Sequence, residues 1–396
     1  MNGYNGNKKI GLVFSGGPAP SANAVISSAC LSFLNNNIPV IGFYCGFEFL
    51  EKYNSEKGFL LNENIHYRTL EIDIAHIRNR RGVYLKTSRG NPGKDIHSKK
   101  DLDDPEKSKK LRNIIEALDS LGIGHLITIG GDDTLKTANY LSLLGFPVIH
   151  IPKTIDNDYF GIAWTFGYWS SVQMCKDILL NLKADAESTD SYFIAELMGR
   201  KAGWVTYAAG IAGESDLMIS SEDIEEKVLD VNKLADKMVD VMISRERRGQ
   251  NYGVLCVAEG LADKLPDELR PKEKDKHGNI LLGTAEVARI LKDIVADRYT
   301  ERTGRKKKIT AKQIGYETRT VVPISFDVVL GSMLGFGAYR LYCNGSISCM
   351  VSVSDNFQIV AVPFDQLIDP DTLLTKLRAV PKGSDFFELK EALSYI

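Results

Sequence analysis

Residues 10–34 read IGLVFSGGPAPSANAVISSACLSFL, and this stretch decides the fold class of the chain. Its first five residues form a continuous apolar run, which is typical of a buried strand in a parallel sheet. A Ser-Gly-Gly-Pro turn follows, and apolar residues then recur at helical spacing until three asparagines at 35–37 end the helix. A buried strand, a glycine turn and a helix together predict an α/β protein.

The same alternation continues along the chain. Further strands are predicted at 40–43, 126–129, 148–151, 192–195, 254–257 and 314–316. Helices are predicted at 105–121, from the turn at 130 through 144, and at 166–182, 202–212, 224–243, 284–301 and 327–342. This rhythm indicates two domains, each a parallel sheet covered by helices on both faces. We expect a first domain at 1–160, a second at 161–330, and a C-terminal helix and strands at 331–396 that pack back across both.

Composition excludes several classes of protein. The 396 residues include 49 basic and 51 acidic side chains, so no strong electrostatic attraction to nucleic acid or an anionic membrane is expected. No apolar run is long enough to span a bilayer, and the polar beginning MNGYNGNKK does not resemble a signal peptide. The six cysteines form no CxxC pair, so we expect reduced core residues in a cytoplasmic protein.

Four polar or glycine-rich turns directly follow predicted strands, where ligands bind in open α/β sheets. They are residues 15–20, 130–134, 152–158 and 198–203. The first turn can offer backbone N–H groups to an anion, although a Gly-Gly turn serves equally well as a tight connection. In the second, Asp132 and Asp133 could hold Mg²⁺ together with substrate phosphates, or one could simply cap the helix.

The third turn, PKTIDND, is the most informative. It combines a cation, a hydroxyl and carboxylates within a few residues. Phosphoryl transfer needs a base for the acceptor hydroxyl, a charge clamp and a metal, so Asp156 suits the base and Lys153 the clamp. A polar loop before the next helix is the alternative. In the fourth turn, Arg200 could bind phosphate or lie at the surface, and the later segments VAEG and GYETR add a carboxylate and an arginine after two further strands.

Taken in order, these motifs resemble the 6-phosphofructokinase family over roughly residues 8–342. The segments that carry the resemblance are SGGPAPSANAVI, GGDDT, PKTIDND, MGRKAGW, VAEG and GYETR. The resemblance implies two Rossmann-like α/β domains with the active site in the cleft, and phosphorylation of the C1 hydroxyl of fructose 6-phosphate in glycolysis. It also implies Mg²⁺ as cofactor and a homodimer or homotetramer as the assembly.

The resemblance also implies a role for each matching residue. Asp156 corresponds to the general base, and Asp132 to the Mg²⁺ ligand. The remaining catalytic residues are Lys153, Thr154 and Arg200. The donor phosphates are expected at Gly16, Gly17, Arg89 and Asp133. The sugar phosphate is expected at Thr154, Asp156, Met198, Gly199, Arg200, Glu259, Tyr316 and Arg319.

The combination of Asp133 and Lys153 resembles the pyrophosphate-dependent branch of the family, whose reaction is reversible. Two positions depart from the family pattern. Ser191 stands where an arginine usually reaches the neighbouring subunit, and a second family arginine aligns with either Lys308 or Lys312. The alternatives are an ATP-dependent enzyme, a non-catalytic regulatory subunit, and a seven-carbon ketose phosphate as the sugar.

Overall fold

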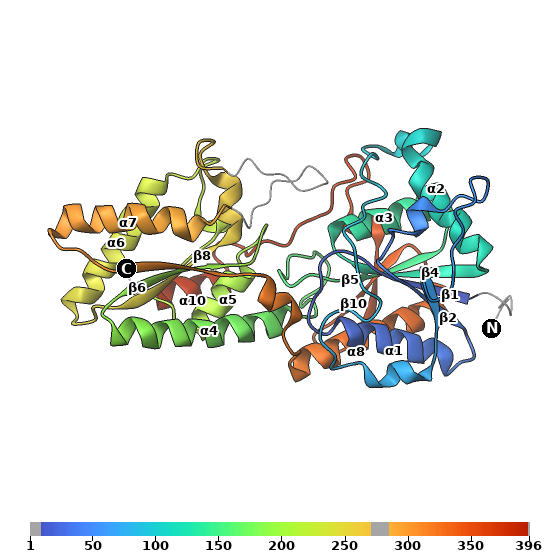
Figure 1. The fold of residues 1–396 in the computed structure, drawn as a ribbon, viewed down its shortest axis with the longest axis horizontal. Coiled ribbons are helices and arrows are strands. Elements are labelled where there is room, and N and C mark those ends of the chain that lie inside the picture. Colours follow the sequence, from blue (N-terminus) through green and yellow to red (C-terminus); the bar gives the residue numbers. More distant parts are fainter. Residues whose placement is uncertain (1–8, 271–284, 395–396) are drawn as a thin grey trace. The chain divides into compact units, whose positions relative to one another are not determined.

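A computed structural model describes residues 9–270 and 285–394, which form two compact units (Figure 1). Unit 1 comprises the described residues up to Thr154, together with Tyr159–Trp169 and Arg319–Leu377. Unit 2 comprises Ile155–Asp158, Ser170–Thr318 and the described residues from Arg378 onward. The chain therefore passes between the units several times, and the domain boundaries expected near residues 160 and 330 stay a prediction.

Unit 1 is built on a seven-stranded sheet with the strand order β11-β10-β5-β4-β1-β2-β3. The strands are β1 (Lys9–Phe14), β2 (Val40–Phe43), β3 (Tyr67–Leu70), β4 (Ile123–Gly130), β5 (Val148–Pro152), β10 (Cys349–Val353) and β11 (Ile359–Pro363). The five inner strands pair in parallel, whereas the two edge strands β3 and β11 are antiparallel to their neighbours. Residues 10–14 are all buried, which explains the continuous apolar run in β1.

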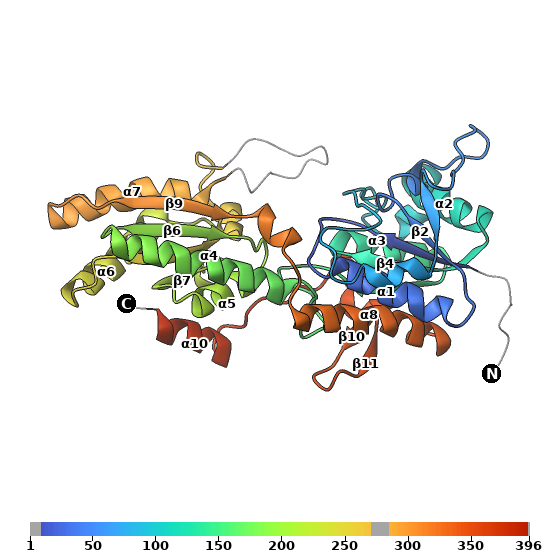
Figure 2. The same ribbon diagram turned by 60° about the horizontal axis from the view of Figure 1, so that its bottom comes forward.

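Helices cover both faces of this sheet. In Figure 1, α1 (Ala22–Leu34) and α8 (Ser325–Cys343) lie on one face, and α2 (Pro105–Ser120) and α3 (Asp132–Leu143) lie on the other. The hydroxyl of Ser21, just before α1, donates to the carbonyl of Asp327 in α8 at 2.7 Å, so the two helices are tied together near their ends. Figure 2 shows the β10–β11 hairpin beside α8, with α9 (Phe364–Leu367) following it.

Unit 2 contains a four-stranded parallel sheet in the order β7-β8-β6-β9. Its strands are β6 (Tyr192–Leu197), β7 (Leu217–Ile219), β8 (Gly253–Ala258) and β9 (Ile309–Ile314). One face is covered by α6 (Val231–Arg247) and α7 (Val287–Thr303), whose buried residues form a continuous core with β6, β7 and β8. The other face carries α4 (Tyr168–Ser188) and α5 (Trp204–Ala212), and α10 (Asp385–Leu393) packs beside α5 (Figure 2).

The α/β class expected from the sequence is confirmed, with a few local differences. Helix α6 begins at Val231 instead of 224, because the carboxylate of Asp230 caps it by accepting from two backbone N–H groups. The strand expected at 314–316 ends at Ile314, since Thr318 bonds back to the carbonyl of Gly315 and forms a 3₁₀ turn, η7 (Tyr316–Thr320). The expected start of α7 at 284 lies outside the described residues. Strands β3 and β7 were not predicted, whereas β10 and β11 lie within 331–396, where strands were expected without stated bounds.

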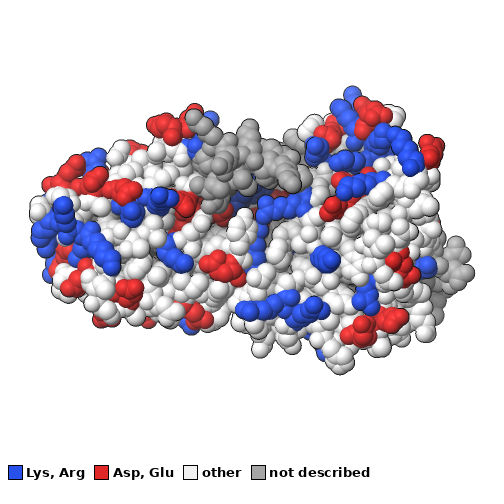
Figure 3. Space-filling view, in the orientation of Figure 1, with Lys and Arg blue, Asp and Glu red and all other residues white. Residues whose placement is uncertain are grey.

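Three general expectations can be compared with the structure. Four of the six cysteines are buried, whereas Cys45 is half-buried and Cys343 is exposed. Within residues 9–270 and 285–394, no helix is long and apolar enough to span a bilayer. On the face drawn in Figure 3, lysines and arginines are scattered among acidic side chains, in keeping with the near-zero net charge.

Candidate functional site

Three of the four predicted turns meet at one edge of the unit 1 sheet. Strands β5, β4 and β1 are neighbours and parallel, with Gly130 paired to Pro152 and Phe14 paired to Ile129. The segments 15–20, 130–134 and 152–158 therefore leave adjacent strand ends. This is the place where open α/β sheets bind ligands.

The first turn is bordered by the loop that carries Arg89. Gly16 has a φ of +90°, and its N–H donates to the carbonyl of Ser88 at 2.8 Å. The hydroxyl of Thr87 donates to the Gly16 carbonyl at 2.6 Å, which fixes both sides of the turn. Helix α1 begins at Ala22, so the turn does not open the helix directly. A donor phosphate can accept a hydrogen bond from the Gly16 N–H only if the bond from this N–H to the Ser88 carbonyl breaks.

Two cationic side chains lie against the two glycines of this turn. A Cβ atom built on Gly16 would lie 3.2 Å from Nζ of Lys153, and one built on Gly17 would lie 2.7 Å from Nη1 of Arg319. Lys153 follows β5 directly and is only 8% exposed. The absence of side chains at both glycines is thus what lets the two cations approach the backbone. Such a turn, with two cations beside it, suits an anionic ligand.

The two aspartates of the second turn occupy the first positions of α3. The cap residue is Gly131, which makes no side-chain cap bond, so neither aspartate is the helix cap. Asp132 is half-buried and Asp133 is exposed, and both lie where the helix dipole favours a carboxylate. In the described part of the chain, no group of three or more His, Cys, Asp or Glu side chains could hold a metal. The carboxylates of Asp132 and Asp133 are hard oxygen donors, which fits a Mg²⁺ that takes its other ligands from substrate phosphates and water.

A buried network lies beneath the second and third turns, and the sequence analysis did not identify it. The hydroxyl of Tyr159 donates to the carbonyl of Gly130 at 3.1 Å, and His150 Nε2 lies 3.1 Å from that hydroxyl. His150 Nδ1 lies 2.9 Å from the hydroxyl of Thr128. Burial lowers the pKa of His150 to about 3, so the ring is neutral at pH 7. In the sequence, the feature that could have indicated this network is a histidine inside an otherwise apolar strand.

The third turn continues from β5. The N–H of Lys153 donates to the Gly130 carbonyl at 2.9 Å, which joins this turn to the second. Thr154 and Asp156 are half-buried, and Asn157 between Asp156 and Asp158 adopts a φ of 55°. Thr154 belongs to unit 1, whereas Ile155–Asp158 belong to unit 2. The predicted catalytic segment thus lies where the chain leaves one unit and joins the other.

The remaining predicted residues gather at the equivalent edge of the unit 2 sheet. Strand β6 has β8 and β9 as its neighbours, and Leu197 pairs with both Ala258 and Ile314. Three segments therefore meet there, beginning at Met198, Glu259 and Gly315. They line a pocket of about 140 Å³, whose walls are Glu196, Leu197, Met198, Glu259, Gln313, Ile314, Gly315, Tyr316 and Glu317.

Two of these segments pack against each other through their backbones. The N–H of Gly260 donates to the carbonyl of Gly199 at 3.0 Å, and a Cβ on Gly260 would lie 2.2 Å from the Arg200 carbonyl. Only glycine at 260 permits this approach, which brings Glu259 to the 198–203 turn. Gly199 has a φ of +140°. The Arg200 side chain is exposed, with Nε 3.8 Å from Asp263.

Glu196 is a buried carboxylate in the pocket wall that the sequence analysis also missed. It accepts from the backbone N–H of Ala288 at 2.9 Å and from the Gln313 amide at 3.4 Å. Burial raises its pKa above the usual value for a glutamate. Tyr316, in contrast, is the first residue of η7, and its side chain is 64% exposed.

The two departures from the family pattern can be located. Ser191 is buried before β6, and its hydroxyl lies 2.7 Å from that of Thr189. Lys308 and Lys312 are both exposed, and the Lys308 carbonyl accepts from the Tyr192 N–H.

Curated relatives cover nearly the whole chain. A pyrophosphate–fructose 6-phosphate 1-phosphotransferase from Thermotoga maritima is 33% identical over 96% of this chain and 89% of its own length. An ATP-dependent 6-phosphofructokinase from Corynebacterium efficiens is 31% identical over 92% of this chain and 94% of its own length. Relatives named for either phosphoryl donor are therefore almost equally similar.

Solved structures share the fold. A pyrophosphate-dependent phosphofructokinase from Nitrosospira multiformis superposes with a TM-score of 0.70 at 18% identity, covering 98% of this chain and 91% of the other. Phosphofructokinase from Saccharomyces cerevisiae gives 0.69 at 22% identity, covering 91% of this chain and 45% of the longer yeast chain. The sequence profile described as Phosphofructokinase matches residues 9–342. The chain belongs to the phosphofructokinase family.

Proposed function

We propose that this chain transfers a phosphoryl group reversibly from pyrophosphate to the C1 hydroxyl of fructose 6-phosphate, giving fructose 1,6-bisphosphate and phosphate. The observation that carries the choice of donor is the combination of Asp133, in the first turn of α3, with the largely buried Lys153, whose ammonium lies at the Gly16 turn. A compact cation at this turn suits a small, highly charged donor and the phosphate that leaves. The name and similarity of the Thermotoga maritima relative support the same choice.

Each proposed residue has a distinct part in the reaction. Asp156 takes the proton from the C1 hydroxyl, because an ionised carboxylate is a competent base at neutral pH. Thr154 donates a hydrogen bond to the transferred group, and Arg200 stabilises its charge. Asp132 would hold Mg²⁺, which would neutralise charge on the donor phosphates.

The two substrates have separate binding residues in this proposal. The donor is held at the turns that contain Gly16, Gly17, Arg89 and Asp133. The sugar phosphate is held by Met198, Gly199 and Glu259 at its hydroxyls, and by Tyr316 and Arg319 at the 6-phosphate. The pocket lined by Met198, Glu259 and Tyr316 supports this division.

Asp133 gives the donor proposal its physical basis. In a nucleotide-using site, glycine at this position leaves room for the α-phosphate. A carboxylate ~4 Å from a phosphate charge is repelled by about 4 kcal/mol at an effective dielectric constant of ~20. Because about 1.4 kcal/mol corresponds to a factor of ten, this repulsion disfavours ATP by orders of magnitude.

The test is an assay of the purified chain with fructose 6-phosphate, Mg²⁺ and either pyrophosphate or ATP. We expect kcat/KM to be far higher with pyrophosphate, and the reverse reaction to proceed when phosphate is supplied. A preference for ATP would favour the ATP-dependent alternative. Inactivity with both donors would favour a regulatory subunit.

Two substitutions at one position separate charge from size. Asp133→Asn removes the charge and keeps the volume, whereas Asp133→Gly removes both. We expect Asp133→Asn to raise the use of ATP and Asp133→Gly to raise it further. If neither substitution changes kcat/KM for ATP, Asp133 does not select the donor.

A further inference from the structure

The chain runs through unit 1 from Arg319 to Leu377, and the described residues from Arg378 onward belong to unit 2 again. Helix α10 packs on α5, which begins directly after the 198–203 turn. The ring of Phe386 stacks on Trp204 with centroids 5.4 Å apart, and Phe387 meets Tyr207 edge to face at 5.9 Å. The C-terminal segment, residues 378–394, is thus attached to the helix that bears one predicted catalytic turn.

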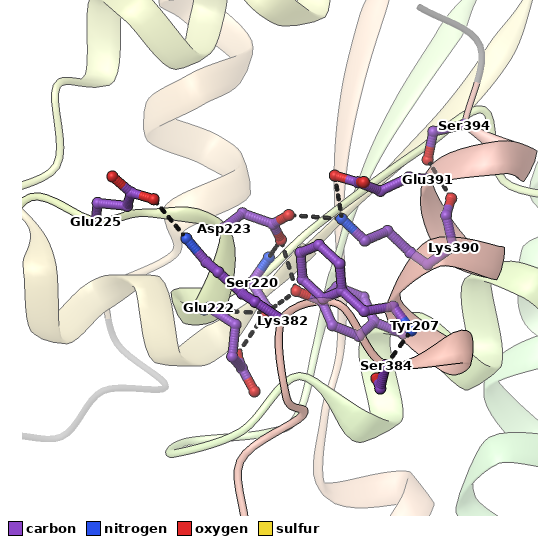
Figure 4. A network of polar contacts seen from close by, with 11 residues as sticks. Tyr207, Ser220, Glu222, Asp223, Glu225, Lys382, Ser384, Lys390, Glu391 and Ser394 are labelled. Carbon is purple, nitrogen blue, oxygen red and sulfur yellow. Dashed lines mark hydrogen bonds and ion pairs between the residues drawn. The ribbon is translucent and has the colours of Figure 1, made fainter.

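A buried ion pair anchors this segment. Nζ of Lys390 lies 2.6 Å from Asp223, and both side chains are less than one-tenth exposed. Asp223 also accepts from the Tyr207 hydroxyl at 2.6 Å and from the Ser220 N–H at 2.8 Å, so both of its oxygens are engaged (Figure 4). Removing one partner of such a pair leaves an uncompensated buried charge, so the segment is held firmly in place.

Glu222 joins the anchored segment to the fourth turn. One carboxylate oxygen accepts from the Gly203 N–H at 2.8 Å and from the Val380 N–H at 3.1 Å. The other oxygen accepts from the Ser220 hydroxyl at 2.6 Å (Figure 4). Hydrogen bonds to an ionised carboxylate are among the stronger ones in proteins. A single side chain therefore holds the end of the 198–203 turn and the C-terminal segment together.

The same segment also reaches the third turn. The N–H of Arg378 donates to the carbonyl of Asp158 at 2.9 Å, and the Arg378 carbonyl accepts from the Trp204 indole at 2.9 Å. The Arg378 guanidinium lies over the Trp204 ring, 4.4 Å from its centroid. Asp158 is two residues from Asp156, so residues 378–380 are hydrogen-bonded to the third turn, to Trp204 directly after the fourth turn, and through Glu222 to Gly203 at its end.

We propose that Glu222 is a positioning residue, and that with the backbone of residues 378–380 it fixes the third and fourth turns relative to each other. The inference rests on the proposed function, since it concerns Asp156 and Arg200. Glu222 acts through Gly203 and Val380 and does not itself contact the reacting groups. A misplacement of about 1 Å costs up to ~10²-fold in rate, so loss of this bridge lowers kcat.

The test compares three variants with the wild type for kcat, for KM of both substrates and for melting temperature. Glu222→Ala should lower kcat at least 10-fold at temperatures well below its melting point, with the KM of the donor changed less than 3-fold. Because Met198 and Gly199 lie in the fourth turn, the KM of the sugar phosphate should also rise, but by a smaller factor than kcat falls. Glu222→Gln should recover most of kcat, because its amide oxygen still accepts from the two N–H groups. Glu225→Ala is the matched control: this exposed carboxylate pairs with Lys382 of the same segment but contacts neither turn, so wild-type kinetics are expected.

A fourth variant tests the proposal if the Glu222→Ala protein does not fold. Trp204→Phe keeps an aromatic ring but removes the indole N–H that donates to Arg378, and we expect a several-fold loss in kcat with the fold retained. Unchanged kcat in folded Glu222→Ala and Trp204→Phe would overturn the proposal, as would a loss confined to melting temperature. The variants are assayed with whichever donor the wild type uses. A wild type that prefers ATP contradicts only the donor assignment, whereas an inactive wild type overturns both proposals.

Discussion

Gly17→Ala tests whether Arg319 binds the 6-phosphate from the position that its guanidinium occupies beside the first turn. The added Cβ would lie 2.7 Å from Nη1 of Arg319 and 3.6 Å from its Cζ, closer to the nitrogen than real Cβ contacts come. The backbone at Gly17 is not in the left-handed region, so alanine can adopt its conformation. The atom that must move is the end of a flexible side chain, so we expect the guanidinium to shift while the turn stays folded.

The structure sets the size of this effect. The guanidinium must move by about 0.7 Å to reach the 3.4 Å of ordinary contact. Charge-assisted hydrogen bonds depend strongly on geometry, and losing a forked pair to phosphate costs about 1.5–3 kcal/mol. That range corresponds to roughly a 10- to 150-fold rise in KM for the sugar phosphate. Because Gly17 also lies in the turn proposed to hold the donor, we expect the KM of the donor to rise as well, but by a smaller factor than that of the sugar phosphate.

The assay measures KM for both substrates in the wild type, Gly17→Ala, Arg319→Ala and the double variant. If Gly17→Ala acts by displacing Arg319, the double variant should be no worse than Arg319→Ala alone. Gly90→Ala is the control, because its Cβ would lie 3.5 Å from the nearest atom, which is an ordinary contact. Additive effects of the two substitutions, or normal kinetics in Gly17→Ala, would refute the reasoning.

Three further outcomes are expected. Asp156→Ser should lower kcat by ~10²-fold or more, and near-normal kcat in the folded variant would exclude Asp156 as the base. Burial lowers the pKa of His150 to about 3 and of His125 to about 4. The unfolded chain, with pKa values near 6.5, binds more protons, so stability falls as the pH drops below about 6.5. The loss at pH 5 is about 2 kcal/mol for each histidine, and urea unfolding of His150→Asn should show a smaller loss than the wild type. Asp216→Ala leaves Arg245 buried without its ion-pair partner, which should lower the free energy of unfolding by about 3–5 kcal/mol; a change under 1 kcal/mol would contradict this.

The sequence by itself determined the α/β class, most of the inner strands and the four polar turns. These features depend on local patterns: a strand buried on both faces is a continuous apolar run, and a helix repeats its apolar residues every three to four positions. Residues such as Asp132 and Asp156 were found because each lies in a polar turn that directly follows such a run. The short edge strands β3 and β11 carry weaker patterns, since an edge strand is less completely buried.

Only the tertiary structure decided which side chains meet. The strand order β5-β4-β1 brings Lys153 to Gly16, and the return of the chain after unit 2 brings Arg319 to Gly17. The contacts of His150 with Tyr159, and of Glu222 with Gly203 and Val380, likewise join segments that no local pattern relates. The physical reason is that the pattern of apolar residues along the chain determines which segments form helices and strands, and which of their faces are buried. The partner of a polar side chain depends instead on how the elements pack, and on where a glycine leaves room for it.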